Sequence, residues 1–265
     1  MSKAVAKTKA EANLPSEEVL DLLSMHEGEG LDYETSDLQI PFIRIIQALS
    51  PQINKRDPAY IDGASSGDVF NTVTGQHWEG EKGITVIPCY QETKYLKFTP
   101  RESGGGFLGE LAKDDPDVVA ATRTGSKEIL PDGNELVKSD QHYCIVLEDG
   151  VPSFGIVDMK SSQLKVSRRW KTQIKMLSVK HPKTGVLVSP PIFGTMWQLT
   201  TVEESNDQGT WMNWSVANAG FVEDKEILEA AVTFRKSVMS GEAKAVAQDV
   251  ADEQKPSEAV EDAPF

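Results

Sequence analysis

Five basic side chains lie close together between positions 165 and 175, where one stretch of chain could hold them on a single surface. They are Lys165, Arg168, Arg169, Lys171 and Lys175. On a helical wheel with 100° per residue they occupy the half opposite an apolar set. That set is Val166, Trp170, Ile174 and Leu177. Cations on one face of a helix can neutralise successive phosphates of a nucleic-acid strand. The pattern predicts a phosphate-binding helix over residues 161–177, capped by Ser161 or Ser162.

The charge of the surrounding sequence supports this interpretation. From Met159 to Val202 the chain has forty-four residues, eight of them basic and none acidic. A solvated helix of the usual kind interleaves both signs through pairs four residues apart. The absence of acids therefore favours a binding surface over an ordinary solvated face. Lys160, at the start of this acid-free window, joins the candidate phosphate-binding residues.

Aromatic residues near these cations could stack on the bases of a single strand. A second cluster, from Lys94 to Arg101, alternates cations and aromatics at strand spacing, and we add Lys94, Lys97 and Arg101 to the phosphate-binding set. The base-stacking candidates are Tyr95, Phe98, Trp170, Trp197 and Trp211. For any one of them, packing in the core is the more frequent role, so we expect one to three of the five to reach bases.

The last five residues form a candidate recognition tip. They are Glu261, Asp262, Ala263, Pro264 and Phe265. The ring of Phe265 could fill a small apolar pocket while the carboxylates meet Lys or Arg at its rim, and Pro264 limits the conformations lost on binding. Acidic tails are common in proteins, so the tip by itself also fits a simple solubilising tail.

Signals for enzymatic chemistry are weak. Ser103-Gly104-Gly105-Gly106 lacks the Lys and Ser/Thr of a phosphate-binding loop, and the sequence has no GxGxxG, GxSxG or HExxH motif. Asp68, Glu79 and Glu81 are a faint candidate for a metal-dependent nuclease cluster. Cys89 and Cys144 lie in apolar segments typical of buried thiols. We therefore expect no catalysis, no cofactor and no metal site.

Alternating apolar and polar residues place most of these side chains on strands. We expect hairpins formed by 68–72 with 76–78 and by 141–147 with 153–159, strands at 192–202 and 209–222, and one long or two paired strands over 83–90 and 94–98. We expect helices over 161–177 and 223–239, the latter ending at Gly241, and a short amphipathic piece over 17–23 capped by Ser16. The apolar run 40–49 is compatible with a helix or a strand.

This element order predicts a mainly β fold with two or three helices. It fits a five-stranded oligonucleotide/oligosaccharide-binding barrel, whose helix lies between the third and fourth strands. Other small barrels and sandwiches share the pattern. We expect a flexible acidic arm at 1–37, a binding domain at 38–241 with a long surface insertion at 100–140, and a disordered acidic tail at 242–265.

The net charge of −14 is concentrated at the two ends of the chain. Residues 1–37 hold three Lys and nine acids, and residues 242–265 hold two Lys and seven acids. A domain with a basic surface between acidic ends is expected when a tail can occupy the site that its own domain offers to a polyanion. No apolar run reaches the length of a membrane span, and residues 1–4 lead into no signal region. These features predict a cytosolic protein without a membrane partner.

Several segments resemble the single-stranded DNA-binding proteins of tailed bacterial viruses. They are residues 40–51, 67–75, 83–88 and 159–165 and the Glu-Asp-Ala-Pro-Phe end. The resemblance covers most of residues 38–240 and the tip. The chain departs from the common bacterial tip in having Glu-Asp-Ala where Asp-Asp-Ile is usual, and it lacks a Gly/Gln-rich linker.

The resemblance implies a non-catalytic role in viral DNA replication, recombination and repair, in the cytoplasm of the host bacterium. The protein would coat single-stranded DNA without reading sequence and recruit a polymerase, nuclease or helicase through Phe265. Glu258, Glu261 and Asp262 would occupy the groove when DNA is absent. A homodimer is compatible with this role. Two alternatives stay open, a strand-annealing recombination protein and a protein–protein adaptor or transcription coactivator that works mainly through its tip.

Overall fold

The structure of the chain is a computed structural model that describes residues 15–26, 30, 40–125, 127–148, 150–207 and 209–243. The chain divides into two units, residues 1–38 and residues 39–265. In the first unit, α1 (Glu17–Ser24) is a short amphipathic helix with no buried side chain, and Glu17 and Glu18 lie in its first turn, where the helix dipole favours acids. The predicted helical piece is confirmed, although the Ser16 side chain makes no capping hydrogen bond.

The second unit contains all the other elements, with η marking a short 3-10 helix. In chain order they are β1 (Phe42–Ile45), η3 (Pro51–Ile53), β2 (Val69–Asn71), β3 (His77–Trp78), β4 (Ile84–Phe98), η4 (Arg101–Ser103), β5 (Phe107–Leu111), α2 (Pro116–Val119), β6 (Thr122–Thr124), β7 (Lys127–Ile129), β8 (Glu135–Glu148), β9 (Val151–Lys160), η5 (Ser161–Gln163), α3 (Leu164–Met176), β10 (Val179–Lys180), β11 (Leu187–Val188), η6 (Ile192–Gly194), β12 (Thr195–Asn206), β13 (Gly209–Phe221) and α4 (Lys225–Ser240). The predicted mainly β fold is confirmed.

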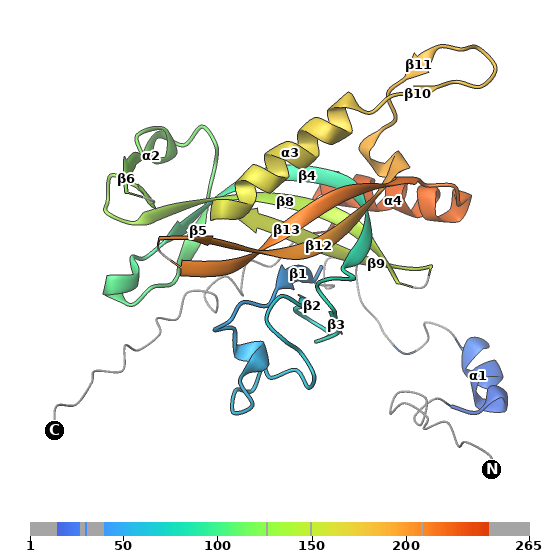
Figure 1. Ribbon diagram of the computed structural model, residues 1–265, viewed down its shortest axis with the longest axis horizontal. Helices are drawn as coiled ribbons and strands as arrows, with labels where there is room; N and C mark the ends of the chain where they lie inside the picture. Colours follow the sequence, from blue (N-terminus) through green and yellow to red (C-terminus); the bar gives the residue numbers. More distant parts are fainter. Residues whose placement is uncertain are drawn as a thin grey trace. The chain divides into compact units, whose positions relative to one another are not determined.

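One mixed sheet of eleven strands organises this unit (Figure 1). Its main path runs β13-β12-β4-β8-β9-β1-β2-β3. Beside this path β5 pairs with β4, β7 pairs with β8, and β6 pairs with β7. β1 and β9 run parallel, whereas the other paired neighbours are antiparallel. The 15-residue β4 and the 14-residue β8 pair along almost their whole length, from Thr85 and Leu147 to Phe98 and Glu135.

The sheet has a hydrophobic cluster on each of its two faces, and it curls around the larger cluster. Neighbouring residues of a strand point to opposite faces, so along β8 Cys144 lies in an inner cluster and Tyr143 in an outer one. The inner cluster also contains Ile45 of β1 and Trp214 of β13, which are far apart along the sheet path. Only a strongly curled sheet brings these two side chains together, so the inner face is concave. The helix α4 packs Phe234 against the outer cluster.

Side-chain hydrogen bonds and one backbone bond, from Thr201 N to the Gly80 carbonyl oxygen at 2.9 Å, join the two ends of the curl without a continuous backbone ladder. The amide nitrogen of Gln47 donates to the Met212 carbonyl oxygen at 3.0 Å, and its amide oxygen accepts from Met212 N at 2.9 Å. The Thr201 hydroxyl donates to the Gly67 carbonyl oxygen at 2.6 Å. This approach needs glycine at position 80, because a Cβ there would lie 1.9 Å from the Gly67 oxygen.

The prediction of a closed five-stranded barrel is therefore wrong. Among the described strands, β13 pairs only with β12 and β3 pairs only with β2, so the sheet is a curled half-barrel. The physical reason lies in the long strands β4 and β8. They run past the curl into an extension where β5 and β7 also pair, and Leu96 and Phe98 form a small core there. The sheet thus has more strands than a five-stranded barrel.

Most of the predicted strands are confirmed. The hairpins β2–β3, β8–β9 and β12–β13 pair as expected. Within the apolar run 40–49, residues 42–45 are the strand β1, and residues 84–98 form a single strand. The segment 100–140, expected to be a surface insertion, contains η4, β5, α2, β6, β7 and the start of β8.

The two long helices, α3 and α4, differ in how their ends are capped. The Asp224 carboxylate accepts from Glu226 N at 2.7 Å and from Ile227 N at 3.1 Å, and Gly241 closes α4 at φ 78°, as predicted. In α3, Gln163 is the N-cap residue and makes no side-chain capping bond. The prediction of a Ser161 or Ser162 cap is wrong, because a 3-10 turn, with Ser161 at φ 47°, precedes the helix.

Candidate nucleic-acid interface

The apolar side of α3 fills the open concave face of the sheet. Val166, Trp170 and Ile174 pack on the inner cluster, as the helical wheel predicted. Trp170 is fully buried, and its ring stacks on that of His142 with centroids 4.4 Å apart. It also packs edge to face with Trp197 of β12, with the ring centroids 6.2 Å apart. The helix is therefore fixed across the curl, with its opposite side turned outward.

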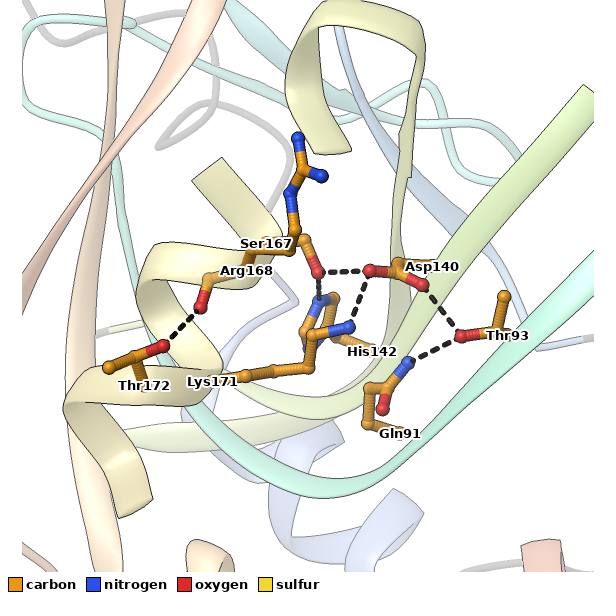
Figure 2. A network of polar contacts seen from close by, with 8 residues as sticks. All are labelled: Gln91, Thr93, Asp140, His142, Ser167, Arg168, Lys171 and Thr172. Carbon is orange, nitrogen blue, oxygen red and sulfur yellow. Dashed lines mark hydrogen bonds and ion pairs between the residues drawn. The ribbon is translucent and has the colours of Figure 1, made fainter. Parts of the chain in front are cut away.

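The buried carboxylate of Asp140 ties α3 to the sheet through hydrogen bonds (Figure 2). Asp140 of β8, which is 1% exposed, accepts hydrogen bonds from Ser167 at 2.7 Å, from Lys171 at 2.6 Å and from Thr93 at 2.7 Å. Burial raises the pKa of Asp140, but the three hydrogen bonds outweigh it, so the pKa is lowered from its ordinary value. The charged form of Asp140 is thus the anchor of the helix.

Ser167, His142 and Asp140 carry the residue types of a nucleophilic triad but are bonded in a different way. The single hydroxyl hydrogen of Ser167 is donated to Asp140, so at 2.9 Å the His142 Nε2 must donate to Ser167 Oγ. In a triad the histidine accepts that hydroxyl hydrogen. Burial lowers the pKa of His142 to about 3, so the ring is neutral. Because all three side chains are at most 1% exposed, we interpret the cluster as structural.

Three cations of the acid-free window are paired with acids of the strands β8, β12 and β9. Lys171 bonds to Asp140, Lys165 lies 2.8 Å from Glu204 of β12, and Lys160 lies 2.6 Å from Asp158 of β9. The expectation that these cations lack an acidic partner is therefore wrong for these three. All three acids lie outside the window in sequence. Asp140 and Glu204 reach their cations through the fold, whereas Asp158 precedes Lys160 by two residues on the same strand, β9.

The cations of the second predicted cluster are also paired. Lys94 lies 2.9 Å from Glu110 of β5 and 3.2 Å from Glu92. Lys97 forms an ion pair with Asp132. The Arg101 side chain lies outside the described part of the structure. The cluster from 94 to 101 thus presents less free positive charge than its sequence suggests.

Three predicted cations are left facing solvent. Arg168, Arg169 and Lys175 are exposed, and they form no ion pair with any described residue. Figure 2 shows the Arg168 guanidinium pointing away from the Asp140 network. One more free cation, Lys138 of β8, was missed by the sequence analysis because it lies in the segment expected to be an insertion. It is exposed and, like Asp140, points to the concave face, since residues two apart in a strand share a face.

The predicted aromatics divide into buried and accessible ones. Phe98, Trp170 and Trp197 are at most 1% exposed, so their rings are covered in this structure. Tyr95 and Trp211 are partly exposed. Tyr95 pairs with Lys138 across the β4–β8 ladder, and the Lys138 ammonium lies 6.0 Å from the centre of its ring. Trp211 pairs with Glu204 across the β12–β13 ladder.

A groove of about 430 Å³ runs between α3 and the β12–β13 hairpin. From the helix it is lined by Lys165, Arg169 and Gln173, which are four residues apart and therefore lie in one row. Glu204 lines the opposite wall. Hydrogen bonds from Lys165 and then Asn213 lower the pKa of Glu204 from its ordinary value. The charged side chains that line the groove are therefore one anion, Glu204, and two cations, Lys165 and Arg169.

The predicted tip, Glu261 to Phe265, lies outside the described residues, as does the rest of the tail from residue 244. In the described part of the chain, no helix has the length and apolar character needed to cross a membrane.

A comparison with protein families identifies the family of the chain. The family model described as Pam3 phage gp34-like protein matches residues 9–244, which include α1, the whole curled sheet, α3 and α4. No curated protein and no solved structure matches the chain.

Proposed function

The chain belongs to the Pam3 phage gp34-like family, and from that premise we propose that it is a sequence-independent single-stranded DNA-binding protein of phage replication and recombination. It coats transient single strands in the cytoplasm of the host bacterium. Its acidic tip, Glu261 to Phe265, recruits polymerase, nuclease or helicase. The protein is not an enzyme in this proposal, and the DNA leaves chemically unchanged.

One observation carries the proposal. The outer side of α3 holds three cations that form no ion pair with a described residue, and one of them, Arg169, lines a groove. An ordinary solvated helix, such as α4, mixes both charge signs, with Lys225 and Glu229 only 3.5 Å apart. A one-signed surface is what a polyanion requires.

The geometry suggests how a strand would be held. Phosphates follow Arg168, Arg169 and Lys175 along the helix and reach Lys138 at the sheet extension. Bases stack on Tyr95 at that end and on Trp211 near the groove, because every base has a π-face. Neither ring carries a fixed set of hydrogen-bonding groups that could read a base edge, so the binding is expected to tolerate all sequences.

The test is a fluorescence titration of the full chain with oligo-dT at several salt concentrations. We expect tryptophan quenching and a log–log slope of affinity against salt of about −3, from four phosphates at about 0.7 each. Trp211→Phe should abolish most of the quenching, because Trp170, Trp197 and Trp214 are buried and the partly exposed Trp78, on β3, does not line the groove beside α3. It should leave most of the affinity intact, since phenylalanine also stacks.

The decisive variant removes the three free cations. It combines the substitutions Arg168→Gln, Arg169→Gln and Lys175→Gln in one protein. At about 0.1 M salt we expect about a hundredfold weaker binding and a slope less negative by about 2. The matched control removes three exposed, unpaired cations elsewhere, as Lys55→Gln, Arg56→Gln and Lys236→Gln. Wild-type protein that fails to bind oligo-dT at low salt, or equal losses in both triple variants, would contradict the proposal.

A further inference from the structure

Beyond α3 the chain forms a small hairpin that projects from the sheet (Figure 1). β10 pairs with β11 through Val179 with Val188 and Lys180 with Leu187, and all residues from 178 to 189 are exposed. The turn is ordered by His181, whose Nδ1 accepts from Lys183 N at 3.2 Å and Thr184 N at 3.3 Å. An isolated two-stranded hairpin is only marginally stable in water, so a partner that covers this projecting hairpin would stabilise it.

One face of this hairpin is made of valines. Val179 and Val188 lie directly opposite each other, and Val186 shares their face because it is two residues from Val188. These side chains are 38%, 46% and 60% exposed respectively. Leu187, on the other face, is 69% exposed. The hairpin thus presents apolar side chains on both sides without covering any of them.

The formal charge of the hairpin is purely positive. Lys180 and Lys183 are exposed and form no ion pair with a described residue. Arg168 and Lys175 of α3 are seven residues apart and lie on one side of the helix, and the hairpin follows that helix directly in the chain. The hairpin therefore continues, in sequence, the acid-free run of cations that α3 carries.

From these features, and resting on the function proposed above, we infer that β10–β11 is a second contact for the same strand. The valine face packs against the faces of unstacked bases. Lys180, on the opposite face with Leu187, and Lys183, in the turn, hold phosphates of the same strand where it passes around the hairpin. Base faces are available in a single strand and hidden in a duplex, and apolar side chains that reach them do so by separating base steps. The hairpin therefore selects single strands and destabilises duplex ends beside them.

The test compares two variants of the full chain that leave the body of the protein untouched. Val179→Thr with Val186→Thr and Val188→Thr removes the apolar face while threonine keeps a high preference for strands. Lys180→Gln with Lys183→Gln removes the charges. The control is Val73→Thr with Val151→Thr, two exposed valines of other turns. Each protein is titrated with oligo-dT across salt and mixed with a short DNA duplex carrying a dT tail.

The valine variant and the lysine variant should lose DNA binding in different ways. For the valine variant we expect about tenfold weaker binding with an unchanged salt slope, because apolar contact releases no counterions. It should also no longer lower the melting temperature of the tailed duplex. For the lysine variant we expect a slope less negative by about 1.4, from two phosphates at about 0.7 each.

Three results would overturn the inference, and they are distinguishable. If the wild type binds oligo-dT but both hairpin variants bind and melt duplexes equally well, the hairpin is not a contact, whereas the proposed function stands. If the wild type sediments as a larger species that the valine variant lacks, at unchanged affinity for DNA, the face belongs to a protein interface. If the wild type does not bind oligo-dT at all, the proposed function itself fails.

Discussion

α3 and α4 pack on opposite faces of one sheet and are both amphipathic, but they are held in place by different forces. α4 is anchored by apolar contacts and by caps at both ends. α3 has no side-chain cap. Besides its apolar contacts, it is held in place by hydrogen bonds to the buried carboxylate of Asp140. The outer side of α4 mixes charges of both signs, whereas the outer side of α3 is wholly positive.

The difference shows how a helix can carry so many like charges. Cations four residues apart on a helix repel each other. Lys165 and Arg169 form one such pair, and Lys171 and Lys175 form another. In each pair the fold neutralises one member, Lys165 through Glu204 and Lys171 through Asp140. The partners Arg169 and Lys175 stay free, so the helix is stable while its outer surface stays positive.

The largest effect on stability is expected when the anchor of α3 is removed by the substitution Asp140→Ala. Ser167, Thr93 and Lys171 all lose their acceptor, and a buried polar group without a partner is costly. We expect the free energy of unfolding to fall by about 3 kcal/mol in urea denaturation, less than for a fully buried pair because Lys171 can turn to water. The matched change on the other helix, Glu229→Ala, removes an exposed pair and should cost less than about 0.5 kcal/mol. Similar losses in both variants would mean that the two helices are held alike.

A second test uses pH on the buried side of α3. The pKa of His142 is about 3 in the folded protein and about 6.5 when unfolded, so below pH 6.5 the unfolded chain takes up a proton that the folded one refuses. Stability is therefore complete above pH 6.5 and falls with pH, by up to about 1.4 kcal/mol per unit, or about 2 kcal/mol at pH 5. The lowered pKa of Asp140 acts only at lower pH, since its stabilisation is lost as the carboxylate is protonated.

Urea denaturation at pH 6.5, 6.0, 5.5 and 5.0 measures this slope. His142→Gln should abolish most of it, whatever that variant costs in stability at neutral pH. His181→Gln, in the exposed hairpin, is the control and should keep the wild-type slope. A slope that is unchanged in His142→Gln would mean that another group takes up the proton.

A third test weakens α4 and leaves the other face alone. Gly241 closes the helix at φ 78°, a conformation that costs other residues energy. We expect Gly241→Ala to lower the free energy of unfolding by about 1 kcal/mol and Gly241→Asn to lower it less, since asparagine tolerates this region better. Affinity for oligo-dT should not change at temperatures where the variants are folded. A parallel loss of DNA binding would show that the two faces are coupled.

The smallest effect is expected from removing the acid that lies beside the positive side of α3. Glu204 is the one anion that lines the groove, so Glu204→Gln frees Lys165 for a phosphate. We expect binding to oligo-dT to tighten about threefold to fivefold at about 0.1 M salt, and the salt slope to become more negative by about 0.7. Glu203→Gln removes the same charge from the other face of β12 and serves as control. Weaker binding by Glu204→Gln would show that the carboxylate orders the site.

Local features of the fold could be predicted because they depend on neighbours in sequence. The spacing of Val166, Trp170 and Ile174 predicted the buried side of α3, and alternation predicted the hairpins of the sheet. The stop at Gly241 followed from the backbone preference of glycine. The five-stranded closed barrel failed, because the length of β4 and β8 and the strands that pair with them depend on contacts between distant segments.

The candidate site was predictable only in part for the same reason. The run of cations from Lys165 to Lys175 is visible in the sequence, and so is the absence of acids around it. Which of those cations remain free is decided by Asp140 and Glu204, which the sheet brings from 31 and 39 positions away. Coulomb interaction depends on distance in space, and a sequence window measures only distance along the chain. By itself, therefore, the sequence determined that a positive helix exists, and the tertiary structure decided which of its charges face outward.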